Sequence, residues 1–99
     1  MEIGNLDHVI SLLTRKKESL LRKYSIREIG VFGSYVRQEQ GTSSDLDVLV
    51  DFEKPISLLK FVEFEAELSE ITGVEVDLVS REALKPHIGE SVRREVVFV

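Results

Sequence analysis

The chain has 99 residues, of which 42% are hydrophobic and 31% charged, a balance typical of a folded protein and too apolar for a disordered one. It contains no cysteine, which excludes disulfide frameworks, cysteine–zinc sites and thiol catalysis. Its net charge of −5 disfavours non-specific binding to duplex nucleic acid. The sequence has no apolar run of membrane-spanning length and no signal-peptide stretch, so we expect one cytoplasmic domain over residues 1–99 and no membrane contact.

The first predicted element is an amphipathic helix that begins after Asn5, a residue suited to the N-cap position. Its apolar residues recur at helical spacing: Leu6, Val9, Ile10, Leu13, Leu20, Leu21 and Tyr24. Residues 27–33 predict a short strand, which Gly33-Ser34 interrupts. Residues 34–39 predict a short helix that ends at Gly41, and a polar loop follows.

Residues 45–52 predict a second strand with two different faces. Side chains alternate along a strand, so Leu46, Val48, Val50 and Phe52 share one face, and Asp45, Asp47 and Asp51 share the other. A second long helix is expected from Ser57 to Gly73, with Leu58, Phe61, Val62, Leu68 and Ile71 on one side. Residues 74–79 alternate again, and Asp77 lies on the face opposite Val76 and Leu78.

The C-terminal part predicts shorter elements. Ser80 is suited to cap a turn that reaches Leu84 and stops at Pro86. Residues 90–95 predict a helix, and the β-prone residues 96–99 predict an edge strand. This order of elements predicts an α/β (α+β) fold, in which helices pack on one face of a small mixed sheet of three to four strands.

Three aspartates carry the clearest chemical signal. Asp45 and Asp47 point to the same side of one strand, and Asp77 lies on the corresponding side of another. If the two strands are neighbours, the carboxylates gather and repel one another unless a cation holds them. Mg²⁺, or Mn²⁺, prefers such oxygen ligands and keeps water positions for a phosphate substrate. The plainer alternative is that the aspartates are solvated residues on an exposed sheet face.

The turn Gly33-Ser34 is the second candidate site feature. Glycine allows close approach to the backbone, and amides at the start of a following helix favour a phosphate. Arg37 lies one turn further on the same helical face, within reach of a phosphate, and Ser43 and Ser44 precede the aspartate pair. The turn is not a P-loop, because the Gly-Lys-Ser/Thr ending is missing, and Asp45-x-Asp47 lacks the pattern of an EF-hand loop.

Taken together, Gly33-Ser34, Asp45-x-Asp47 and the later Asp77 resemble the minimal nucleotidyltransferases of the DNA polymerase β-like superfamily, called MNT-domain proteins. The likeness is clearest from Arg27 to Ser80. Two residues depart from the commoner Gly-Ser-x-Ala-Arg-Gly motif, because Val36 replaces a small residue and Gln38 replaces the final glycine.

The resemblance implies a nucleotidyltransferase-like fold and a function. Family members are often antitoxins paired with a HEPN-domain RNase toxin, and some transfer AMP from ATP to a toxin tyrosine. Gly33, Ser34, Arg37 and Ser44 would then bind the nucleotide's phosphates. Asp45, Asp47 and Asp77 would hold two Mg²⁺ ions and catalyse the transfer. An antitoxin that acts by binding alone, and an enzyme with a small-molecule acceptor, are the alternatives. Leu59, Phe64 and the tail Val97-Phe98-Val99 are candidates for a protein interface.

Overall fold

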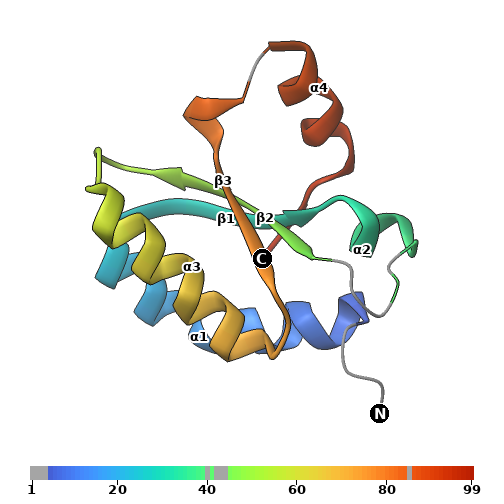
Figure 1. Cartoon of the computed structure of the whole chain (residues 1–99), viewed down its shortest axis with the longest axis horizontal. Coiled ribbons are helices and arrows are strands. Elements are labelled where there is room, and N and C mark those ends of the chain that lie inside the picture. The colour runs from blue at the N-terminus through green and yellow to red at the C-terminus, as the bar shows by residue number, and fades with distance from the viewer. Residues whose placement is uncertain (1–4, 40, 42–44, 85) are drawn as a thin grey trace.

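Four strands form one open sheet in the order β3-β2-β1-β4 (Figure 1). The structure, a computed structural model, describes residues 5–39, 41, 45–84 and 86–99, without the side chains of residues 86–88. The strands are β1 (Ile26–Phe32), β2 (Leu46–Phe52), β3 (Val76–Ser80) and β4 (Val97–Phe98). β1 pairs antiparallel with β2 and β4, whereas β2 pairs parallel with β3, which confirms the predicted mixed sheet.

Helices lie on both sides of this sheet (Figure 1). The two long helices, α1 (Leu6–Tyr24) and α3 (Leu58–Thr72), lie together on one face, as predicted. The single turn α2 (Ser34–Arg37) follows β1. The 3₁₀ turn η1 (Arg81–Ala83) and α4 (Pro86–Glu95) lie on the opposite side, so the second face of the sheet is partly covered.

The strand alternation predicted from the sequence positions the core. Leu46, Val48 and Val50 are 0% exposed and face the long helices. Val76 and Leu78 are also buried, and Asp77 between them is exposed. The carboxylates of β2 and β3 therefore lie on the face that the long helices leave open.

The ends of the long helices follow the predicted caps. The Asn5 side chain accepts a hydrogen bond from the His8 amide at 2.8 Å, and the Ser57 hydroxyl accepts one from the Lys60 amide at 3.1 Å. Gly73 ends α3 in the left-handed conformation, at φ 75°.

Three expectations about the elements are wrong. The predicted helix 34–39 ends at Arg37, because Gln38, not Gly41, takes the left-handed capping conformation at φ 59°. Pro86 does not only end the preceding turn but begins α4, since proline is well accommodated at the first helical position, where no amide hydrogen is needed. The strand expected over 27–33 begins at Ile26 and ends before Gly33.

The predicted core-facing side of α3 is confirmed for Phe61, Leu68 and Ile71 and is wrong for Leu58 and Val62. Phe64 and Leu68 are 0% exposed, whereas Leu58 is 78% and Val62 52% exposed. Phe64 is thus a core residue and is excluded from the candidate interface, while Leu59 remains exposed. Among the described residues, no helix is long and apolar enough to cross a membrane.

Tyr24 joins α1 to α3 through both its ring and its hydroxyl. The ring stacks on Phe64 with 4.5 Å between centroids, and the hydroxyl donates a hydrogen bond to Glu67 Oε1 at 2.6 Å. Burial, together with this hydrogen bond, raises the pKa of Tyr24 to about 12. The hydrogen bonds from Tyr24 and Lys23 lower the pKa of Glu67.

We expect Tyr24→Phe to lower the free energy of unfolding by about 1–2 kcal/mol at pH 7, because Glu67 loses a donor while the ring stacking remains. Because the pKa of Tyr24 is about 12 in the folded protein and 10 in the unfolded chain, the protonated tyrosine stabilises the fold fully below pH 10. This stabilisation is lost as the pH rises through about 12. Urea unfolding at pH 7 and between pH 9 and 11 tests both points. Equal stability of wild type and variant at pH 7 would contradict the role of this hydrogen bond.

Candidate active site

Two of the three predicted aspartates lie side by side on neighbouring strands. Asp47 on β2 and Asp77 on β3 are register partners in the parallel pair, so their side chains leave the sheet on the same face. Asp45 stands one residue before β2 and shares the orientation of Asp47 through the strand alternation. The predicted adjacency of β2 and β3 is therefore confirmed. Asp77 lies on the face of the sheet opposite the long helices α1 and α3.

The electrostatics of Asp47 reflect this arrangement. Partial burial is the main cause that raises the pKa of Asp47, and repulsion from the carboxylates of Asp77 and Asp45 adds to it. Arg37 opposes the shift, and Glu95 increases it. A negative charge on Asp47 is thus costly in the absence of a cation.

Gly33 connects β1 to α2 directly beneath Asp47. Its backbone has φ 80° and ψ −150°, a conformation that only glycine adopts readily. A Cβ atom at this position would collide with the Asp47 carboxylate. Gly33 therefore allows the backbone turn and the Asp47 carboxylate to be in direct contact.

The residues around the turn are arranged differently from the sequence-based expectation. Gly33 itself caps α2, since its carbonyl accepts hydrogen bonds from the amides of Val36 and Arg37, and Ser34 is the first helical residue. The Gly33 amide and the Arg37 guanidinium both bind Glu95, which belongs to α4. Ser43 and Ser44 lie outside the described residues.

The carboxylates fit a divalent cation that is shared with a substrate. Among the described residues, no group of three or more histidine or acidic side chains is arranged to hold a metal ion by itself. Mg²⁺ in phosphate-transferring sites is commonly held by one or two carboxylates together with phosphate oxygens and water. The in-register pair Asp47 and Asp77 matches that donor set, because the substrate's phosphates would supply the remaining oxygens.

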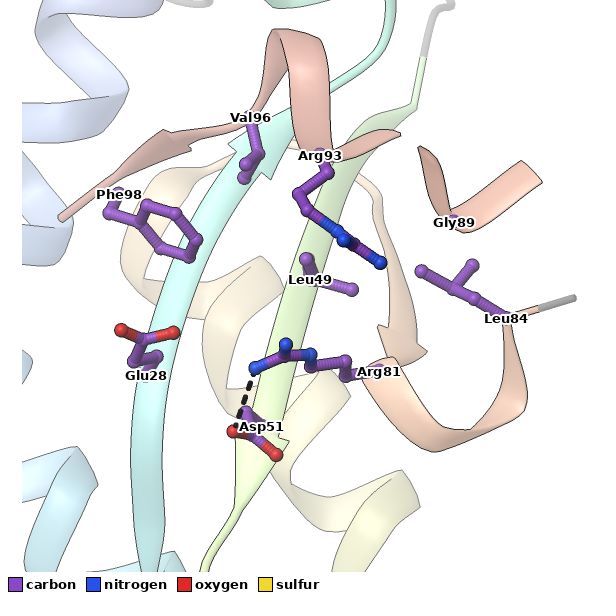
Figure 2. Close-up of a pocket in the computed structure, with 9 residues that line it drawn as sticks. All are labelled: Glu28, Leu49, Asp51, Arg81, Leu84, Gly89, Arg93, Val96 and Phe98. Carbon is purple, nitrogen blue, oxygen red and sulfur yellow. Dashed lines mark hydrogen bonds and ion pairs between the residues drawn. The ribbon is translucent and has the colours of Figure 1, made fainter. Parts of the chain in front are cut away.

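A pocket of about 420 Å³ lies on the same face of the sheet, between β1, β2 and α4 (Figure 2). Leu49 and Phe98 contribute apolar surface, and Arg81 reaches across to Asp51, with 3.4 Å between Nη1 and Oδ2. Arg93 of α4 and Val96, which follows that helix, form another part of the wall. The pocket is next along β2 from Asp47, since Leu49 follows it on the same face.

Sequence reasoning missed Glu95 and this pocket. Leu49 offered a signal, because it is the one apolar residue among the acidic residues on the outward face of β2. Glu95 offered none, because its role depends on where α4 is placed over the sheet.

The comparisons with known proteins agree with this geometry. The nucleotidyltransferase domain model matches residues 13–99. The protein adenylyltransferase MntA of Thermococcus cleftensis is 50% identical over 99 residues, which cover 100% of both chains. A solved structure provisionally assigned as a minimal nucleotidyltransferase has a TM-score of 0.74 and 36% identity, covering 90% of this chain and 93% of its own.

A more distant structure shares the fold. It is the complex of a tri-AMPylated Shewanella oneidensis HEPN toxin with its MNT antitoxin, at a TM-score of 0.65 and 22% identity, covering 89% of this chain and 69% of its own. The family match spans residues 13–99, and the fold agrees with that of the structural relatives. The chain therefore belongs to the nucleotidyltransferase domain family and is a nucleotidyltransferase.

Proposed function

We propose that this chain transfers AMP from ATP to a tyrosine hydroxyl of a HEPN-domain RNase toxin and so acts as its antitoxin. The observation that carries the proposal is the pairing of Asp47 with Asp77 beside the Gly33 turn on the open face of the sheet. The 50% identity to a protein adenylyltransferase over the whole chain supports it. The solved complex of a related fold with an AMPylated HEPN toxin supports the choice of partner.

Each site residue has a distinct task in this proposal. Asp45, Asp47 and Asp77 hold Mg²⁺, or Mn²⁺, and Gly33, Ser34 and Arg37 bind the triphosphate, with Ser44 as a further candidate. The metal, when bound, neutralises the charge that develops on the attacking and leaving oxygens. With a metal ion held between them, Asp47 and Asp77 would also help to position the substrate's phosphates, and such positioning supplies much of the rate in phosphoryl-type transfer.

The reaction is an in-line displacement at the α-phosphorus. The tyrosine oxygen forms a bond to phosphorus, the bond between the α-phosphorus and the bridging oxygen breaks, and pyrophosphate leaves. A tyrosine hydroxyl has a pKa near 10, so its proton must be removed during the attack. Asp77 is exposed, and we assign it the task of accepting this proton.

Labelled ATP tests the proposal directly. The chain is incubated with α-labelled ATP, Mg²⁺ and a HEPN-type RNase that carries an Arg-x-x-x-x-His motif. We expect label on the toxin and loss of the label in the double variant Asp45→Asn/Asp47→Asn. Glu75→Gln, which removes an exposed carboxylate at the start of the same strand pair, should label normally. Undiminished labelling by the double variant would refute the assigned roles.

A second candidate function is neutralisation by binding alone. Leu58 and Leu59 are each 78% exposed and Val62 is 52% exposed, which together form an apolar patch at the start of α3 suited to a protein partner. If binding alone sufficed, Asp45→Asn/Asp47→Asn would still protect cells from the toxin at equal stoichiometry. If catalysis is required, the double variant fails to protect although it still co-purifies with the toxin.

A further inference from the structure

The last residue of α4 is bound at the turn assigned to phosphate. Glu95 Oε2 accepts a hydrogen bond from the Gly33 amide at 2.8 Å. Both oxygens of the same carboxylate contact Arg37 Nη1, at 3.0 and 3.1 Å. One carboxylate thus binds the two groups, a backbone N–H and a guanidinium, that the proposed function gives to the nucleotide.

The chemistry of this contact is the chemistry of phosphate binding. Carboxylate and phosphate are both oxyanions that accept short, charge-assisted hydrogen bonds from amides and from arginine. The position of Glu95 is otherwise unfavourable, because it adds a negative charge close to Asp47, whose pKa it helps to raise. Arg37 compensates for that charge only in part, since it also pairs with Glu39 at 2.7 Å.

The backbone around Glu95 is fixed, while its side chain can move. The Val96 amide still bonds to the Val92 carbonyl at 2.9 Å, and β4 then pairs with β1. Gly30 permits this close packing, because a Cβ there would meet the side chain of Val96. The side chain of Glu95 is 24% exposed, so it can turn toward solvent without disturbing the strand pairing.

We propose that the Glu95 carboxylate occupies the phosphate position at Gly33 and Arg37 in the nucleotide-free protein and is displaced when a triphosphate binds. This inference rests on the proposed function, because it concerns the same turn. Glu95 sets the nucleotide affinity: every binding event must first break its contacts to Gly33 and Arg37. The apparent affinity is reduced by the fraction of molecules in which the carboxylate is in place.

Titration calorimetry with Glu95→Gln tests this competition. Glutamine keeps an acceptor for the Gly33 amide but removes the charge, so we expect roughly three- to tenfold tighter binding of Mg-ATP. The matched control is Glu90→Gln on the same helix, where the carboxylate pairs only with Arg94 at 3.1 Å among the described residues, and its ATP affinity should equal that of the wild type. Unchanged or weaker binding by Glu95→Gln would show that Glu95 supports the turn and would overturn the proposal.

A measurement on the wild-type protein covers the case in which Glu95→Gln folds poorly. The Gly33 amide resonance of the wild-type protein, recorded in the presence of EDTA, should shift on addition of tripolyphosphate. If the resonance does not respond to tripolyphosphate, the proposal fails. If the wild-type chain fails to label the toxin but its Gly33 resonance still responds to tripolyphosphate, only the proposed function is refuted. The two failures are therefore distinguishable.

Discussion

Replacing Asp47 with asparagine should nearly abolish AMP transfer and leave the fold at least as stable as that of the wild type at pH 7. Transfer should fall by on the order of 100- to 1000-fold, because in the proposed mechanism the site loses a charge that holds the metal ion. Stability should not fall, since the carboxylate is held beside Asp77 and Asp45 and its raised pKa marks a cost of ionisation in the fold. A residue that destabilises the protein and is needed for the reaction is typical of an active site.

The sign of the pH dependence makes this prediction specific. The folded state binds the Asp47 proton more tightly than the unfolded chain, in which the pKa of this carboxyl is near 3.8. Wild-type stability therefore falls, relative to Asp47→Asn, as the pH rises from about 4 through the raised pKa. Below that window the two proteins should melt at similar temperatures, and at pH 7 the variant should melt at an equal or higher one.

Thermal unfolding between pH 3.5 and 7 measures this difference. The matched control is Glu75→Gln, which should leave the transfer rate unchanged. A variant that melts well below the wild type at all pH values would show that Asp47 stabilises the fold, contrary to the arrangement of the three carboxylates.

The sheet and its acidic face could be predicted because they depend on local alternation. Burial of Leu46, Val48 and Val50 forces Asp45 and Asp47 to the other side of the strand, whatever the rest of the chain does. The adjacency of β2 and β3 needed only the assumption that a long helix returns the chain to a neighbouring parallel position. The capping residues at Asn5, Ser57 and Gly73 were readable for the same local reason.

The remaining features depend on long-range packing, which local patterns do not encode. In α3 the sequence offers apolar residues on more than one side, and only the contact with α1 and the sheet selects Phe64 and Leu68 over Leu58 and Val62. The position of α4 over the open face, and with it the contact of Glu95 with Gly33, joins residues 62 positions apart.

The departure of Gln38 from the commoner motif has a local explanation in the structure. Its φ of 59° lies in the left-handed region, where glycine is the least strained residue and the motif's final glycine is expected. Gln38 adopts this conformation and still ends α2, with its amide bonded to the carbonyls of Ser34 and Tyr35. The substitution therefore leaves the turn in place, and the aspartates are unaffected.

Gly33→Ala should be the most damaging single substitution at the site. The alanine would have to adopt a backbone conformation almost restricted to glycine, and its Cβ would meet the Asp47 carboxylate. We expect a loss of about 2–4 kcal/mol in the free energy of unfolding and no detectable transfer. Urea unfolding followed by circular dichroism measures the loss.

A double-mutant cycle separates the two causes of this damage. In an Asp47→Ala background the collision with the carboxylate is removed, and the backbone strain and a tight contact with the Cβ of residue 47 remain. Gly33→Ala should therefore cost about 1–2 kcal/mol less than it does in the wild type. Gly73→Ala is the control, because Gly73 also has a positive φ, at 75°, but a Cβ there meets nothing within 4 Å. Its cost should be the same with and without Asp47. Equal costs of Gly33→Ala in both backgrounds would mean that the turn and the carboxylate are not in contact. The proposed phosphate site at Gly33 would then be separate from the proposed metal site at the aspartates.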